Sequence, residues 1–226
     1  MAQLFADALT ENPELHLVVV VPRIPDQEGA FNATPQYVGR RQAVDLCVRA
    51  GGKDRVHVFD VENRAGTPVY VHSKVCIVDD VWASIGSDNF NRRSWTHDSE
   101  LSTAVLDSTH DPREPHDPAG TGDCARTFAR DLRLALAREH LDLAPDGSQD
   151  DLLIDPVAFV ETIESRAAAL AEWHAGGRRG ERPPGRLRPH RPEKLSRLTR
   201  LWATPVYRLL VDPDGRPLRL RLQRRF

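Results

Sequence analysis

Five segments of the chain have hydrophobic patterns typical of β-strands. Residues 15–21 form a continuous apolar run, as in a strand that is buried on both faces. Residues 55–61 alternate between polar and apolar positions, which predicts a half-buried strand. Three further strands are predicted, over residues 68–78, 81–85 and 100–106. A turn at Asp79 and Asp80 would join the first two of these three strands.

Helical patterns separate and follow these strands. A long helix is predicted from Thr34 and Pro35, which are typical of an N-cap and a first helical position, to the glycines at 51–52. Three other helices are predicted, over residues 3–9, 122–140 and 156–174. Strands and helices in this order favour an α/β fold, in which a mixed sheet is covered by helices.

The C-terminal part of the chain has a different composition. Residues 176–200 are rich in Arg, Pro and Gly and offer little to bury, so we expect a mobile linker or a chain that lies over the surface. Apolar positions on either side of a turn at 212–215 predict a terminal hairpin. The sequence is therefore divided into three parts: residues 1–145, a helical extension over 146–175, and the linker with its hairpin over 176–226.

Charge is distributed unevenly although the net charge is only −2. Residues 176–226 contain 15 Lys and Arg against 4 Asp and Glu, a surplus of 11 positive charges, and the rest of the chain carries a surplus of 13 negative charges. The basic tail is therefore the part expected to meet anions. An anionic membrane surface is one candidate partner, and nucleic acid is less favoured because few aromatic residues interleave with the arginines. A solvated linker is the simplest interpretation.

Features of secreted and membrane-spanning proteins are lacking in the sequence. The three cysteines, Cys47, Cys76 and Cys124, have no CxxC spacing, so neither a disulfide framework nor a zinc site is indicated. The apolar run at 15–21 is too short to span a bilayer, and the acidic residues before it are unlike the start of a signal peptide. We expect a cytoplasmic protein, or a peripheral one at the inner membrane surface.

One cluster of polar residues carries recognisable chemistry. From His72 to Asn89 the sequence follows the pattern H-x-K-x4-D-x6-G-S-x-N. His72 and Lys74 are two residues apart, so on a strand their side chains project from the same face. An imidazole beside an ammonium group suits a phosphodiester, which needs a fixed cation and a nucleophile or an acid. Asp79 would lie on the opposite strand face, and we expect it to hold the site structurally.

Further residues would complete such a site. The Ser87 hydroxyl, the Asn89 amide and the flexible backbone of Gly86 would supply neutral donors around the phosphate oxygens. Glu100 opens the next predicted strand and is the candidate partner for the second imidazole nitrogen of His72. This arrangement predicts phosphodiester transfer or hydrolysis.

These residues resemble the HKD motif of the phospholipase D superfamily, with its G-S-x-N extension and the acidic residue that begins the following strand. The flanking sequence resembles the second half of lipid-acting phospholipase D and cardiolipin synthase-like proteins at residues 70–74, 92–95, 97–100 and 138–141. The resemblance implies a catalytic half-domain over residues 1–145. It also implies a phosphohistidine mechanism on phospholipid without a metal or other cofactor, with His72 as general acid and then general base.

Members of that superfamily bring two motifs together, but none of the other eight histidines here has a lysine two residues later. Two histidines with different duties are what a two-step transfer requires. The second motif is expected from a homodimer or from a partner chain. Three functions remain open here: a phosphatidyltransferase or phosphodiesterase acting on phospholipid, a nuclease of the same superfamily, and a catalytically silent half-domain that binds phosphate ligands or a partner.

Other residues near the motif are weaker candidates. Arg92 and Arg93 could bind a head group or a second phosphate, although paired arginines in loops are usually solvated. Trp95, with Trp82, could line a cleft for lipid chains, although aromatic residues beside strands more often pack in the core. The acidic stretch over 107–117 resembles a set of metal ligands, but nothing fixes its geometry, and no metal site is predicted.

Overall fold

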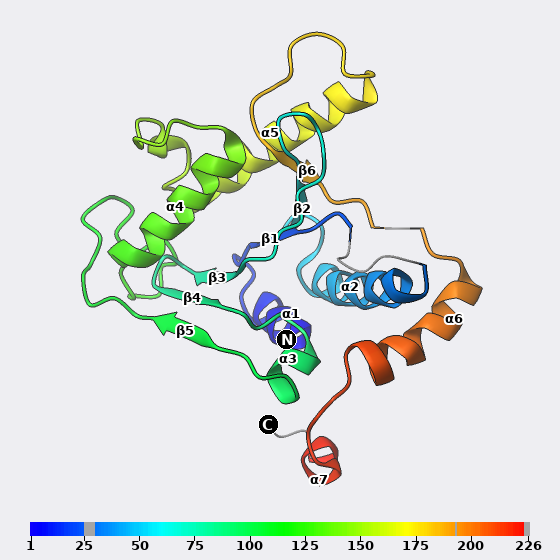
Figure 1. Cartoon of the computed structure of the whole chain (residues 1–226). Helices are drawn as coiled ribbons and strands as arrows, with labels where there is room; N and C mark the ends of the chain where they lie inside the picture. The colour runs from blue at the N-terminus through cyan, green and yellow to red at the C-terminus, as the bar shows by residue number, and fades with distance from the viewer. Residues whose placement is uncertain (25–29, 193, 224–226) are drawn as a thin grey trace.

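A computed structural model describes residues 1–24, 30–192 and 194–223, without the side chains of residues 30–32. Two small sheets are combined with helices in a mixed α/β arrangement, which confirms the predicted fold class (Figure 1). The helices are α1 (Ala2–Glu11), α2 (Ala30–Gly51), α3 (Arg92–Thr96), α4 (Thr127–Leu141), α5 (Pro156–Ala175), α6 (Arg197–Val206) and α7 (Leu218–Leu222). Two shorter turns are the 3-10 turn η1 (Asp150–Leu152) and the π-helical turn η2 (Tyr207–Val211).

The strands are divided between two three-stranded sheets rather than gathered in one. The first sheet has the order β1 (Leu17–Val21), β2 (Val56–Val61), β6 (Leu187–Pro189), with β1 parallel to β2 and β6 antiparallel to it. The second sheet is antiparallel and consists of β3 (Lys74–Val78), β4 (Trp82–Gly86) and β5 (Ser102–Val105). The strand expected over 68–78 is therefore shorter at its start, where Pro68 forms only an isolated bridge with Glu62.

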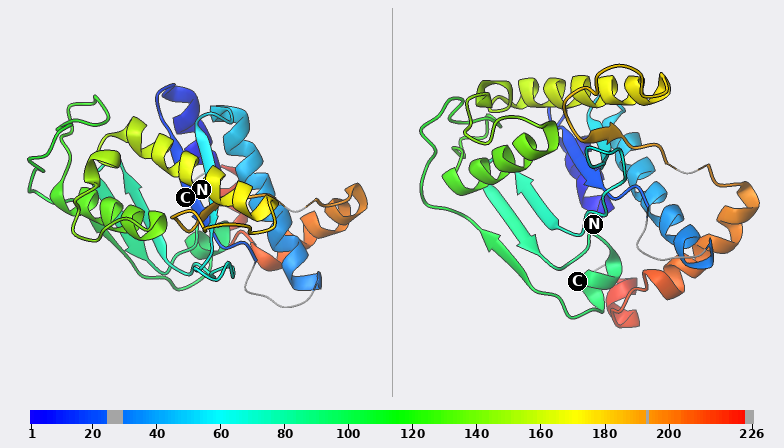
Figure 2. Two further views of the ribbon diagram at one scale, coloured as in Figure 1. Left: turned by 90° about the horizontal axis from the view of Figure 1, so that it is seen from above. Right: turned by 45° about the horizontal axis from the view of Figure 1, so that its top comes forward.

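The main hydrophobic core lies between the first sheet and helices α4 and α5 (Figure 2). Apolar residues three or four positions apart turn one face of each helix toward β2 and β6. The buried cluster contains Phe59, Val61, Leu134, Ala137, Leu141, Ile163, Ala167 and Leu187. Each fully buried Leu or Ile contributes roughly 1.5–3 kcal/mol of transfer free energy. A smaller cluster of Leu9, Cys47 and Val56 joins α1, α2 and β2.

Of the two alternatives for residues 176–200, the described part of the segment agrees with a chain that lies over the surface rather than with a mobile linker, because buried carboxylates hold much of it. Glu62 directly follows strand β2, and its fully buried side chain faces His174 at 2.8 Å, Arg182 at 3.3 Å and Arg188 at 3.4 Å. Burial alone would raise the pKa of Glu62, but these positive partners lower it. Ion pairing therefore orders a segment that has few apolar residues to bury.

The expected terminal hairpin is also wrong, since residues 197–222 form α6, η2 and α7. The side chain of Ser196 caps α6 by accepting a hydrogen bond from the Thr199 amide at 3.0 Å. At η2 the ring of Tyr207 packs so closely on Gly39 of α2 that no side chain fits at that glycine. Contact with another helix thus decides the structure of a segment whose apolar spacing also suits a strand.

The start of α2 differs from the prediction as well. The helix begins at Ala30, and Pro35 lies within it rather than at its first position. Pro35 therefore removes one intrahelical hydrogen bond instead of starting the helix.

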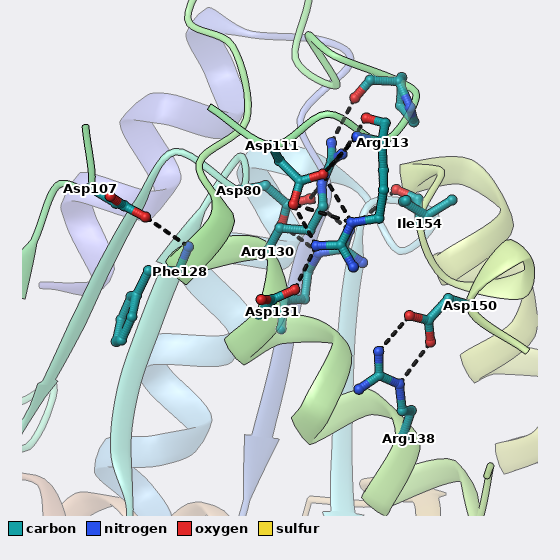
Figure 3. Close-up of polar contacts among 12 residues, drawn as sticks. Asp80, Asp107, Asp111, Arg113, Phe128, Arg130, Asp131, Arg138, Asp150 and Ile154 are labelled. Carbon is teal, nitrogen blue, oxygen red and sulfur yellow. Dashed lines mark hydrogen bonds and ion pairs between the residues drawn. The ribbon is translucent and has the colours of Figure 1, made fainter. Parts of the chain in front are cut away.

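A buried guanidinium joins α4 to the turn between β3 and β4 (Figure 3). Arg130 is fully buried, and it contacts Asp80 at 3.0 Å and Asp111 at 3.3 Å. Its remaining N–H groups donate to the backbone oxygens of Arg113 at 2.7 Å and Pro115 at 2.6 Å. The acidic stretch over 107–117 thus supplies Asp111 as an ion-pair partner for Arg130. Among the described residues, no three His, Cys, Asp or Glu side chains are grouped so that they could hold a metal ion.

Replacement of Asp111 by Asn should reduce the acid dependence of stability. Hydrogen bonds from Arg113 lower the pKa of Asp111 from 3.8 to about 2, against the effect of burial. A carboxyl group of this kind stabilises the fold above its unfolded pKa and loses that contribution as the pH falls through its folded pKa. The stability advantage of the wild type over Asp111→Asn should therefore shrink by about 2 kcal/mol from about pH 4 to about pH 2.

Urea unfolding across this pH range measures the difference. Asp123→Asn is the matched control, because Asp123 is exposed and forms no described ion pair. Parallel pH curves for the wild type and Asp111→Asn would contradict the prediction.

Candidate functional site

The second sheet brings together polar residues that are far apart in the sequence. In its register Lys74 lies opposite Gly86, and Gly86 lies opposite Ser102. Ser87 follows β4 and Glu100 precedes β5, so both residues lie at the same end of the sheet as Lys74. This register gathers Lys74, Gly86, Ser87 and Glu100 at the open end of the β3–β4 hairpin, away from the turn that contains Asp79.

His72 and Lys74 lie at the entrance to β3. The Lys74 ammonium donates a hydrogen bond to the backbone oxygen of His72 at 2.7 Å. The exposed imidazole of His72 stacks on Tyr70, with ring centroids 5.8 Å apart. The cation is thus held beside the backbone of the histidine, and the imidazole faces solvent.

Ser87 and Glu100 form the second pair of the site. The Ser87 hydroxyl donates to Glu100 Oε2 at 2.6 Å and accepts from the Leu101 amide at 3.0 Å. Hydrogen bonds from Ser87 and Ser94 lower the pKa of Glu100, and the charge of Lys74 adds to this effect. Glu100 is therefore an anion at neutral pH. Its hydrogen-bond partner is Ser87, and the expected hydrogen bond to His72 is not formed among the described residues.

The loop after Ser87 is held by hydrogen bonds between its backbone and nearby side chains. The Asn89 amide N–H donates to Ser94 Oγ at 3.1 Å, and the Trp95 indole donates to the Asn89 carbonyl at 3.1 Å. Asn91 caps the short helix α3 by accepting from the Ser94 amide. The Asn89 side chain is exposed and forms no hydrogen bond with the described residues, so its amide remains available to a ligand. The Trp95 side chain therefore stabilises this loop.

Comparison with known proteins identifies the family. The family model described as "Cardiolipin synthase, PLD-like domain" matches residues 18–111. A stretch of 97 residues is 42% identical to phospholipase D zeta 1 of Arabidopsis thaliana, covering 42% of this chain and 8% of that protein. Phospholipase D1 of Mus musculus is 42% identical over 122 residues, covering 52% of this chain and 11% of that protein. The chain belongs to the phospholipase D superfamily.

A third relative extends the similarity along the chain. Phospholipase D1 of Homo sapiens is 30% identical over 200 residues, covering 76% of this chain and 18% of that protein. The matched regions thus span less than a fifth of the length of these three curated relatives. No solved structure gives a significant match.

Gly86 is required for the close approach of β4 and β5 in this phospholipase D superfamily chain. A Cβ added to Gly86 would lie 2.6 Å from Ser102 Cβ and 2.7 Å from Ser102 Cα. Such distances leave no space for a side chain. The sequence indicated Gly86 as a backbone donor to substrate, and the structure adds that it permits the strand register.

The acidic residue of the motif lies far from the other members. Asp79 is in the β3–β4 turn with φ 53°, at the opposite end of β3 from Lys74. It forms no hydrogen bond or ion pair with the described residues. Its neighbour Asp80 is buried and binds Arg130 and Arg133. Asp80 is therefore the residue that anchors the hairpin, a function that its sequence position did not reveal.

The arginines after the loop are engaged by the C-terminal segment. The buried carboxylate of Asp212 accepts from the Arg93 amide at 2.7 Å and from the Tyr207 hydroxyl at 2.9 Å. Arg92 donates to the Asp212 carbonyl at 2.8 Å. The Arg93 guanidinium binds Asp98 at 2.8 Å. Both arginines thus have partners within the chain, and sequence reasoning missed Asp212 because it lies 119 positions from Arg93.

Replacement of Asp212 by Asn should loosen the first turn of α3. Loss of the charge weakens the hydrogen bonds to Arg93 and Arg92, at a cost of about 1–3 kcal/mol for a buried group. We expect faster amide hydrogen exchange at residues 93–97, measured by mass spectrometry.

Asp214→Asn is the matched control for this change. Asp214 pairs with Arg216 and Arg221 of its own segment, and among the described residues its side chain forms no hydrogen bond or ion pair with α3. Equal exchange at residues 93–97 in the two variants would contradict a role for Asp212 in docking.

Proposed function

We propose that this chain forms one half of a phospholipase D-like site that transfers a phosphatidyl group to water or to an alcohol. The observation that carries the proposal is the β3–β4–β5 register, which places Lys74 beside the Ser87–Glu100 pair. The names of the matched relatives support phospholipid as the substrate.

Each group in the half-site has a task in phosphodiester transfer. Lys74 supplies a fixed positive charge for the non-bridging oxygens, and Asn89 supplies a neutral donor. The anionic Glu100 stabilises positive charge in the site, that of Lys74 and of the His72 imidazolium when it forms. Ser87 holds the carboxylate in place.

The reaction needs two imidazoles in sequence. One imidazole nitrogen attacks phosphorus, and the phosphorus–oxygen bond to the leaving alcohol breaks while the second imidazolium protonates that oxygen. The second imidazole then removes the proton from water or an acceptor alcohol, which attacks phosphorus and releases the first histidine. His72 takes the acid and base role, and in a symmetric pair either copy can be the nucleophile.

A surface for the second half is present beside the site. β5 is an edge strand whose first three residues are exposed. Leu101 and Leu106 flank it with 80% and 68% of their surface exposed. Exposed apolar groups next to an uncovered strand edge mark a pairing surface. We infer that a second copy or a partner polypeptide covers this edge and contributes the second histidine.

The assembled protein should be far more active than the monomer. One imidazole cannot serve as nucleophile and as acid in the same step. Sedimentation over a concentration series, run beside hydrolysis of phosphatidylglycerol in EDTA, should show turnover rising with assembly. Mixing His72→Ala chains into wild type should lower turnover more than dilution does, and His72→Ala alone should lose at least about a thousandfold.

His116→Ala is the control, because the one ion pair of His116 within the described residues is with Glu114, outside the site. Equal turnover per chain in monomer and assembly would contradict the need for a second half. Cleavage of DNA without cleavage of lipid would identify a nuclease instead, and binding without turnover would identify a silent half-domain.

Glu100→Gln should impair turnover and leave the fold intact. The amide oxygen can still accept from Ser87, but the negative charge that stabilises Lys74 and an imidazolium is lost. We expect a loss of roughly tenfold or more and a change in the pH profile of turnover. Glu161→Gln on the exposed face of α5 is the control for loss of a carboxylate. Unchanged turnover in a folded Glu100→Gln protein would remove Glu100 from the site.

A further inference from the structure

The C-terminal helices expose an unusual number of large apolar side chains. Seven of them are at least 38% exposed within residues 197–222: Leu198, Leu201, Trp202, Leu209, Leu210, Leu218 and Leu222. Leu198 and Leu201 each have 74% of their surface exposed, and Leu222 has 85%. Apolar groups gathered in this way indicate an interaction surface. We call these seven residues the C-terminal apolar face.

The orientation of α6 is the reverse of that of an ordinary surface helix. Ala203 is fully buried on the side that packs against α2. At 3.6 residues per turn, Leu198 and Leu201 lie on the side of the helix opposite Ala203. A surface helix normally turns its apolar stripe toward the core. Here the small residue faces inward and the leucines face outward.

Exposed arginines accompany the apolar face. Arg197, Arg200, Arg208 and Arg219 are exposed, and they form no ion pair within the described part of the chain. The two acidic residues of residues 197–222 are occupied, Asp212 by Arg92 and Asp214 by Arg216. The segment therefore presents leucines and uncompensated positive charge together. An anionic bilayer accepts both, the leucines among the acyl chains and the guanidinium groups at the phosphates.

The segment is fixed to the body of the protein close to the candidate site. Tyr207 packs on Gly39 of α2, and the Gly215 amide donates to Thr96 Oγ1 of α3 at 2.9 Å. Both ribbon views show α6 at the periphery and α7 next to α3 (Figures 1 and 2). Because α3 follows the loop with Ser87 and Asn89, a membrane on this face would lie near the half-site.

We propose that α6, η2 and α7 form an interfacial face that docks on anionic phospholipid bilayers. This proposal deepens the proposed function by naming the surface that meets the lipid, and it is tested by binding. No helix in the described ranges has the length and apolar character to cross a membrane, which agrees with docking at the interface. The sequence predicted that the basic tail over 176–226 meets anions, and within this tail Arg182 and Arg188 are held by Glu62.

Vesicle flotation of the full chain tests the proposal. The chain should float with vesicles of phosphatidylcholine and phosphatidylglycerol, and much less with phosphatidylcholine alone or at high salt. Leu201→Gln with Leu209→Gln should lower the partition coefficient at least about tenfold. Arg200→Gln with Arg208→Gln should lower it roughly tenfold or more on anionic vesicles only.

Leu4→Gln with Val157→Gln is the matched control. These residues are 54% and 65% exposed on α1 and α5, away from the C-terminal apolar face, and their replacement should leave binding unchanged. Circular dichroism verifies the fold of each variant. Equal vesicle binding by wild type and the Leu201/Leu209 variant would overturn the proposal. Self-association that this variant loses, without vesicle binding by wild type, would instead make the face an interface between copies.

A soluble phosphodiester separates this proposal from the proposed function. Vesicle binding that depends on Leu201 and Leu209, without turnover of any phosphodiester, would support the membrane face and contradict the enzyme assignment. Turnover of the soluble phosphodiester without vesicle binding would support the enzyme assignment and contradict the membrane face.

Discussion

The buried guanidinium of Arg130 is the constraint on which the position of the half-site depends. A charge with no solvent exposure must be neutralised, and Asp80 and Asp111 do so together. Removal of one partner of such a pair typically costs about 3–5 kcal/mol, because the other charge stays buried. Asp80 also binds Arg133, and its carbonyl accepts from the Arg126 amide at 2.7 Å. Helix α4 and its N-cap residue therefore hold the turn of the hairpin through three residues, Arg126, Arg130 and Arg133.

The effect of this anchor reaches the other end of the hairpin through the strand register. β3 and β4 are five residues each and paired along their length, so fixing the turn also fixes Lys74 and Gly86. Gly86 then allows β5 to approach, and the Ser87 hydroxyl meets Glu100. Backbone pairing thus sets the positions of these residues, and the Ser87–Glu100 hydrogen bond adds a side-chain contact to it. This explains why the polar groups of the site can be exposed and still have defined positions.

The parts of the structure that could be predicted from sequence are those fixed by local pattern. The run at 15–21 became β1, and the spacing of Leu134, Ala137 and Leu141 became the buried face of α4. The phospholipase D superfamily could be recognised because its motif residues lie within one hairpin and the loop after it. The engagement of Arg93 by Asp212 could not be foreseen, since it depends on how distant segments pack.

The C-terminal segment was mispredicted for a related reason. Leu218, Leu220 and Leu222 alternate as in a strand, but η2 and the contacts with α2 and α3 leave them no partner strand, and α7 forms instead. Likewise, the arginines after Gly176 offered no apolar pattern, and their partner Glu62 lies more than 100 positions away in the sequence.

The charge asymmetry between the front and the tail of the chain has two structural consequences. Arg182 and Arg188 reach back to the buried Glu62, and Arg186 pairs with Asp142 at 3.0 Å, so part of the positive surplus is neutralised internally. Arg197, Arg200, Arg208 and Arg219 form no ion pair with the described residues and stay on the surface beside the leucines. The same excess of arginine therefore fastens the tail to the acidic front and leaves its far end positively charged. A chain with a net charge of only −2 can in this way present a strongly basic face.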